Sequence, residues 1–286
     1  GAVNITTVNG IVDLDAITTT GGSGSGTNIG GLAGSVTIDT GADIITLNDN
    51  ITCIGGASET GTGGAGGAVT FSDLVTIDEN ITIDTSGGVG NSGANNGAGG
   101  AILFTTTLDA TVAETLTLTA AGATDGVIDF KQAVGSGTPL GLVTINDAAA
   151  VKAWSTFQCA GFSQTTAGTG TIQFVGLLTS SAAVTITATT VDLDLGITTT
   201  AGSDAGLVTL TGSVDVNLAA AATITTAAAA GTVSGAIAIN GTGSGTATIL
   251  GDLVTTGTNN GSGVGSAGGA VNITTVNGIV DLDAIT

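Results

Sequence analysis

Apolar and polar residues alternate in short runs along this chain. Residues 2–6 (AVNIT) and 11–15 (IVDLD) alternate as half-buried β-strands do, and residues 17–20 (ITTT) form a third short run before a glycine-rich stretch. The same order recurs over 35–67 and again over 68–99. We expect three short strands per repeat, which bury their apolar side only by stacking on neighbouring repeats.

A shorter motif, Gly-x-[Val/Ile]-x-[Ile/Leu/Phe], marks these repeats. Its first three spacings are 33 residues each, whereas only 15 residues separate Gly126 from Gly141. We interpret that short interval as a motif on a second face of a coil. The motif starts at Gly1, Gly34, Gly67, Gly100, Gly126, Gly141, Gly170, Gly206, Gly235 and Gly269.

One long segment is repeated without any change. Residues 1–18 and 269–286 both read GAVNITTVNGIVDLDAIT. We expect residues 1–268 to be one tandem unit of about nine coils, roughly 43 Å long at about 4.8 Å per coil. Residues 269–286 then start the next unit of a continuous solenoid with no separate domain. The alternative is that the ends were duplicated for another purpose, such as end-to-end joining.

Equivalent residues return at a fixed interval, which favours a parallel β-helix over a sandwich of hairpins. The fifth position of the motif is aromatic at four places and aliphatic elsewhere. We therefore predict an all-β fold, a parallel β-helix or β-solenoid, with an interior column of stacked side chains at this position. Its aromatic members are Phe71, Phe104, Phe130 and Phe174, and its aliphatic members include Ile5, Ile38, Ile145, Leu210 and Ile239. Residues 148–164 depart most from the pattern, and we expect a local protrusion there.

Charge and composition exclude several functions. The chain has 22 acidic residues against Lys131 and Lys152, a net charge of −20. Nucleic-acid binding needs many basic side chains, and so does electrostatic docking on anionic membranes. No apolar run approaches the roughly 20 residues that span a bilayer. We therefore expect neither nucleic acid nor membrane insertion.

Enzymatic chemistry finds little support. The chain has no His, Arg or Tyr, so triads built on His are impossible. Paired carboxylates remain: Asp13 with Asp15, and Asp192 with Asp194. Their spacing puts each pair on the outer face of a strand, where a solvated surface is the simpler interpretation. We expect no catalytic residues, no cofactor and no enzyme activity.

The same two aspartate pairs are weak candidates for calcium, which prefers hard oxygen ligands. The glycines of 21–29 resemble a calcium-binding nonapeptide, but Gly26 stands where that motif has Asp. Calcium binding therefore stays open, and the space between laterally packed fibres is where we would place it.

The two cysteines are too far apart to pair. Cys53 follows Gly34 and Cys159 follows Gly141, four motif starts later, which is about 19 Å along a solenoid. A disulfide needs Cα atoms within about 7 Å. We expect two small buried side chains, with an intermolecular bond left open.

Two sequence patterns are typical of other functions. Asn4, Asn50, Asn80, Asn240, Asn260 and Asn272 stand in glycosylation sequons, which arise freely in a chain rich in Asn and Thr. Threonine runs at 17–20, 115–119 and 197–200 are typical of flat ice-binding faces, although threonine also suits the solvent side of any strand.

Strand runs such as GAVNITTVNGIVDLDAITTTGG (1–22) and GSVTIDTGADIITLNDNIT (34–52) resemble the giant filamentous-haemagglutinin-like and autotransporter-type adhesins of bacteria. The resemblance covers the whole chain and consists of strands rich in Val, Ile and Thr, turns with Asp and Asn, and glycine-rich loops. It implies a right-handed parallel β-helix, export to the cell surface, and a role in adhesion, a sheath or a fibre. Because the chain begins at Gly1 without a signal-peptide pattern, we expect an internal piece of a longer exported polypeptide.

We therefore expect a structural protein of an extracellular fibre, sheath or cell-surface filament, built from tandem β-solenoid repeats that associate with one another. An adhesin stalk that presents a distal binding tip is one alternative. An ice- or polysaccharide-binding solenoid is another.

Overall fold

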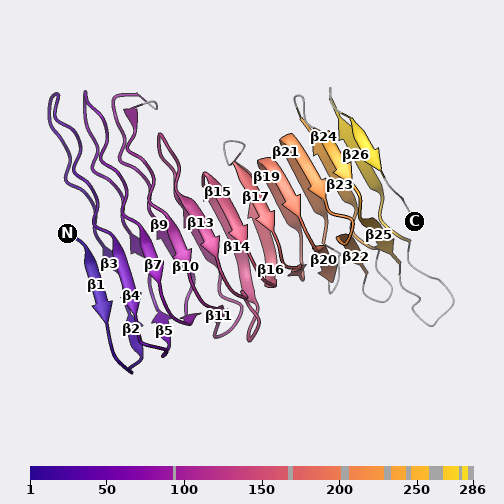
Figure 1. Cartoon of the computed structure of the whole chain (residues 1–286), viewed down its shortest axis with the longest axis horizontal. Coiled ribbons are helices and arrows are strands. Elements are labelled where there is room, and N and C mark those ends of the chain that lie inside the picture. Colours follow the sequence, from indigo (N-terminus) through magenta and orange to yellow (C-terminus); the bar gives the residue numbers. More distant parts are fainter. Residues whose placement is uncertain are drawn as a thin grey trace. The chain divides into compact units, whose positions relative to one another are not determined.

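A computed structural model describes residues 1–92, 95–166, 170–200, 206–228, 233–242, 246–257, 267–276 and 279–282. These residues contain 27 labelled β-strands and no α-helix. The strands pair in parallel from coil to coil, so the fold is a parallel β-helix as predicted (Figure 1). Contacts divide the chain into two compact units, Gly1–Leu140 with Thr144–Lys152, and Gly141–Val143 with Ala153–Thr286.

The first four coils of the first unit each have three short strands, as the alternation predicts. The first-strand column is β1 (Val3–Thr6), β4 (Val36–Asp39), β7 (Val69–Phe71), β10 (Ile102–Phe104) and β13 (Val127–Phe130). The second is β2 (Val12–Leu14), β5 (Ile45–Leu47), β8 (Val75–Ile77) and β11 (Leu108–Ala110). The third is β3 (Ile17–Thr18), β6 (Ile51–Thr52), β9 (Ile81–Asp84), β12 (Leu116–Thr119) and β14 (Leu140–Asp147).

The side chains alternate strictly between core and surface in these strands. In β4 the valine and isoleucine are buried, while the residues between and after them are partly exposed. The core is almost wholly aliphatic, with six phenylalanines as its largest fully buried side chains. Burial of a side chain of this size contributes about 1.5–3 kcal/mol. Stacking of coils is therefore the main source of stability.

Three of the four phenylalanines at the fifth motif position stack in one column. Phe71 pairs with Phe104, and Phe104 with Phe130, at ring-centroid distances of 4.9 and 5.2 Å. Ile38 and Ile5 continue this column. The rings lie nearly parallel because equivalent strands stack without a register shift.

The second unit also has three columns, which we name after β26 and β27, the sequence copies of β1 and β2. Its first-strand column is β16 (Phe157–Gln164), β19 (Val184–Leu193), β21 (Val208–Leu218), β23 (Ile237–Gly241) and β26 (Val271–Thr275). Its second contains β17 (Thr171–Phe174), the later halves of β19 and β21, β24 (Thr246–Ile249) and β27 (Val280–Leu282). Its third contains the start of β16, β18 (Leu178–Ser180), β20 (Gly196–Thr200), β22 (Thr223–Ala227) and β25 (Asp252–Thr256).

Phe174 does not share a column with Leu210 and Ile239, so the prediction of one column for every fifth motif position is wrong. Phe174 pairs with Leu193, and that column ends at Leu282, the copy of Leu14 in a second strand. Leu210 pairs instead with Ile239 in the first-strand column. A glycine followed by alternating apolar residues can open any strand, so the motif alone does not identify the face.

Two other irregular regions are also strands. Asn146 and Asp147 of β14 lie beside Thr119 and Ala120, which confirms that the motif at Gly141 lies on a different face from the one at Gly126. Within residues 148–164, where we expected a protrusion, β15 (Ala150–Ala153) and β16 are mostly buried. Trp154 between them is half exposed.

Candidate functional site: a glycine stem beside the coils

Three glycine-rich loops leave the first unit at the end of a third strand and return at the start of the next first strand. They comprise residues 21–34, 55–67 and the described residues of 87–100, and together we call them the glycine stem. Figure 1 shows these loops projecting beyond the strands at the N-terminal end of the chain. Each has an outgoing limb and a return limb.

Limbs of the same kind stack on each other through backbone hydrogen bonds. On the outgoing side, the Gly24 amide donates to the Ala57 carbonyl and the Ser58 amide to the Val89 carbonyl, both at 2.8 Å. On the return side, the Ala33 amide donates to the Ala65 carbonyl at 2.9 Å. The coil-to-coil ladders of the strands thus continue into the loops.

A second set of bonds joins outgoing to return limbs in a zigzag. Gly31 donates to Gly22, Gly56 to Gly31 and Gly64 to Gly56, at 2.7–2.8 Å between amide nitrogen and carbonyl oxygen. Gly88 and Gly97 extend the series in the third loop. The stem is therefore a two-layer, hydrogen-bonded structure, which explains how loops without side-chain cores remain ordered.

Glycine is required along this seam because the limbs touch backbone to backbone. A Cβ added to Gly56 would lie 2.0 Å from the Gly22 carbonyl oxygen, and one on Gly64 would lie 1.9 Å from that of Gly31. In these limbs two residues face the seam and the third faces outward. Ser23, Leu32, Ala57, Val89 and Ala98 are exposed at this third position. A period of three matches the three residues per turn of a polyproline-II helix, a conformation that glycine can pack closely.

A buried threonine closes the base of two of these loops. Thr19 Oγ1 donates to the Gly34 carbonyl (2.5 Å), and Thr85 Oγ1 to that of Gly100 (2.7 Å). The glycine amides donate back to the carbonyls of the same threonines, at 3.0 and 2.7 Å. In the second unit the hydroxyls of Thr199, Thr226 and Thr255 bond to Gly206, Gly235 and Gly269 in the same way.

Both cysteines occupy this threonine position. Cys53 lies between Thr19 and Thr85 and accepts the Gly67 amide at its carbonyl (2.8 Å), while Cys159 pairs with Ser180. Both are free and buried. Burial raises the pKa of Cys53, and it raises that of Cys159 to about 12 against partly opposing hydrogen bonds. Both thiols are therefore protonated near neutral pH, which makes them poor nucleophiles.

The candidate aspartates do not assemble a site within the described residues. Asp13 Oδ1 accepts a hydrogen bond from Asn48 Nδ2 (2.5 Å), and Asp194 Oδ2 one from Gln173 Nε2 (3.4 Å). Asp13 and Asp15 belong to the first unit, and Asp192 and Asp194 to the second. No group of three or more His, Cys, Asp or Glu side chains converges in the described part of the chain. Calcium at these pairs stays a prediction.

Other polar side chains fix the turns between strands. Asp73 accepts the amides of Thr40, Gly41 and Ala42 from the coil before it, at 2.6–3.2 Å. Partial burial alone would raise the pKa of Asp73, but these bonds outweigh it, so that the pKa is lowered. They also hold Gly41 and Ala42 at φ values of 67° and 99°.

Two asparagines of the glycosylation sequons also accept hydrogen bonds from backbone amides of the following coil. Asn50 Oδ1 accepts the Thr82 amide (2.6 Å), and Asn80 Oδ1 that of Thr115 (2.8 Å). These bonds give Asn50 and Asn80 a structural role. Asn260 lies outside the described residues.

The threonine runs place only alternate residues on the surface. Thr198 faces outward and aligns with Thr179 and Thr225, whereas Thr199 is buried. The outer face of the third-strand column in the second unit is thus a row of threonines one coil apart.

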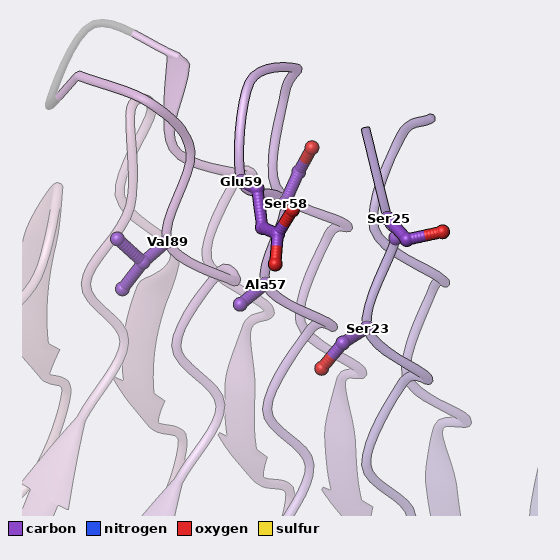
Figure 2. Close-up of a pocket in the computed structure, with 7 residues that line it drawn as sticks. Ser23, Ser25, Ala57, Ser58, Glu59 and Val89 are labelled. Carbon is purple, nitrogen blue, oxygen red and sulfur yellow. The ribbon is translucent and has the colours of Figure 1, made fainter. Parts of the chain in front are cut away.

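The outgoing limbs of the stem border an open hollow of about 330 Å³. Figure 2 shows Ser23, Ala57 and Val89 in successive loops along it, with Ser25, Ser58 and Glu59 toward the loop ends. Its lining is small and mostly apolar, with Glu59 as its one charged member.

Comparisons with protein families, with curated proteins and with solved structures found no match to this chain. No helix in the described part of the chain is long and apolar enough to cross a membrane.

Proposed function

We propose that this chain is a unit of a structural protein that forms an extracellular fibre, sheath or cell-surface filament from tandem, self-associating β-solenoid repeats. Its mechanism is mechanical. Parallel backbone ladders and stacked aliphatic columns resist unfolding, and the glycine stem extends the hydrogen bonding beyond the core. The resemblance to giant bacterial adhesins supports export and a place at the cell surface.

The two copies of the repeated segment carry this proposal. In the first copy Val3, Asn4 and Ile5 pair with Val36, Thr37 and Ile38 of the following coil. In the second copy the equivalent strand, β26, pairs with β23 of the preceding coil, Val271 with Ile237 and Ile273 with Ile239. One sequence therefore accepts a parallel neighbour at either edge, which is what an interior coil of a continuing solenoid needs.

Electron microscopy of the native material, with its denatured mass measured in parallel, tests this function. Long filaments with an axial repeat of roughly 43 Å and a very large denatured mass are the expected result. Single thin rods that never associate favour the stalk that presents a binding tip. Compact particles contradict the proposal.

The threonine row at Thr179, Thr198 and Thr225 favours a second candidate, binding of ice or of an ordered polysaccharide. Its regular coil spacing could match a repeating ligand surface. Thermal hysteresis of the purified chain, or its sedimentation with insoluble polysaccharide, would detect this activity. Thr198→Lys should abolish either effect, and its persistence in that variant would exclude this face.

A further inference from the structure

The glycine stem is almost free of charge in a strongly acidic protein. Its three loops contain Glu59 as their one charged residue, whereas the chain carries 22 acidic and two basic side chains. Two copies with a net charge of −20 each repel one another over most approaches. The stem is the part of the first unit where a second copy can approach at the lowest electrostatic cost.

The two kinds of limb carry different side chains. The return limb of the first loop exposes aliphatic groups, since Ile29 is 68% and Leu32 is 74% exposed. Outgoing limbs are hollowed instead, with Ser23, Ala57 and Val89 in successive loops along the hollow (Figure 2). Exposed aliphatic groups next to a mostly apolar hollow are typical of an interaction surface.

We propose that the glycine stem binds the stem of a second copy of this chain, with Leu32 of one copy entering the hollow beside Ala57 and Val89 of the other. The inference rests on the proposed function, because it names the surface through which the solenoids associate. The closely packed backbone of the stem provides a rigid platform for this contact, so that little conformational entropy is lost on binding.

The contact joins unlike surfaces, and this determines the form of the assembly. A return limb that binds an outgoing limb leaves each copy with one free surface of the other kind. Such heterologous contacts do not close into a dimer unless the rotation between copies closes a ring. Solenoids joined in this way form open lateral arrays, which suits a sheath or a bundle of filaments.

Charge substitutions in the full chain test the proposal. Leu32→Asp and, separately, Ala57→Lys should each weaken lateral association at least tenfold by analytical ultracentrifugation, because each places a charge in the apolar contact. The matched control is Val8→Asp, since Val8 is 84% exposed and lies outside the stem. This control should associate like the unmodified chain, and circular dichroism should show the same β-content in all variants.

A mixture of the two stem variants provides the decisive measurement. The aspartate of Leu32→Asp faces the lysine of Ala57→Lys only if the return limb of one copy meets the outgoing limb of another, so the mixture should regain association. Lack of recovery, or an equal loss in Val8→Asp, overturns the proposed contact.

Comparison of the unmodified chain with the two stem variants distinguishes the two proposals from each other. If native material forms filaments that associate laterally, and both stem variants associate equally well, the fibre function stands and the stem contact is excluded. If it forms no filaments, the proposed function itself fails.

Discussion

At the scale of single residues, the position that closes each glycine loop has the clearest chemistry. Thr19 and Thr85 each exchange two hydrogen bonds with the glycine that opens the next coil. Cys53 occupies the same position and accepts the Gly67 amide at its carbonyl, but a thiol stands where its neighbours have the hydroxyl that bonds to the glycine carbonyl. The sequence held a signal for this pairing, because Thr19 precedes Gly34, and Thr85 precedes Gly100, by the same 15 residues.

Replacing Cys53 with threonine should therefore stabilise the protein. The new hydroxyl can donate to the Gly67 carbonyl as its neighbours do, and a hydrogen bond of this kind contributes about 0.5–1.5 kcal/mol. Urea denaturation would measure the change. Cys53→Ala is the control, and it should lower the free energy of unfolding. An equal loss in Cys53→Thr would show that the position does not accommodate the hydroxyl.

Cys159 should make stability fall at alkaline pH. Its pKa is raised by burial from 9.0 to about 12 in the folded chain. The folded state therefore holds its proton more tightly than the unfolded state, and stability decreases as pH rises from about 9 toward 12. Cys159→Ala should show a shallower decrease over this range. The two proteins would have parallel stability curves if the thiol did not contribute.

At the scale of elements, the strands were largely predictable and the loops were not. Alternation such as that of VTID at 36–39 fixes which side chains face the core, and the structure agrees. The alternation predicts no packing for the loops, whose two layers are joined by backbone hydrogen bonds. Yet GGLAG at 30–34 and GGAGG at 63–67 already contain the period of three that the seam requires.

The seam predicts very different effects for glycine substitutions in the same stem. Gly56→Ala places a Cβ 2.0 Å from the Gly22 carbonyl oxygen, and the resulting overpacking should cost about 1–3 kcal/mol. Gly22→Ala is the matched control, because a Cβ there meets no atom within 4 Å. Its effect should stay within about 0.5 kcal/mol. Equal unfolding midpoints for the two variants would contradict the observed packing of the limbs.

At the scale of the whole molecule, the fold class followed from the fixed return of equivalent residues. The column of Phe71, Phe104 and Phe130 lies in successive coils. Phe174 shows the limit of this inference. β19 and β21 each run through two faces of the solenoid, so the motif does not always lie on the same strand of a coil. Long-range register depends on where a chain turns, and alternation alone does not encode that point.

The most direct test of the central claim uses a chain that contains two copies of residues 1–268 in tandem. Cryo-electron microscopy should show one uninterrupted stack of coils, with the repeated segment GAVNITTVNGIVDLDAIT paired on both sides at the usual spacing of about 4.8 Å. That result would establish the segment as an interior coil of a continuing solenoid. Two separate stacks, with a break at the repeated segment, would contradict the account.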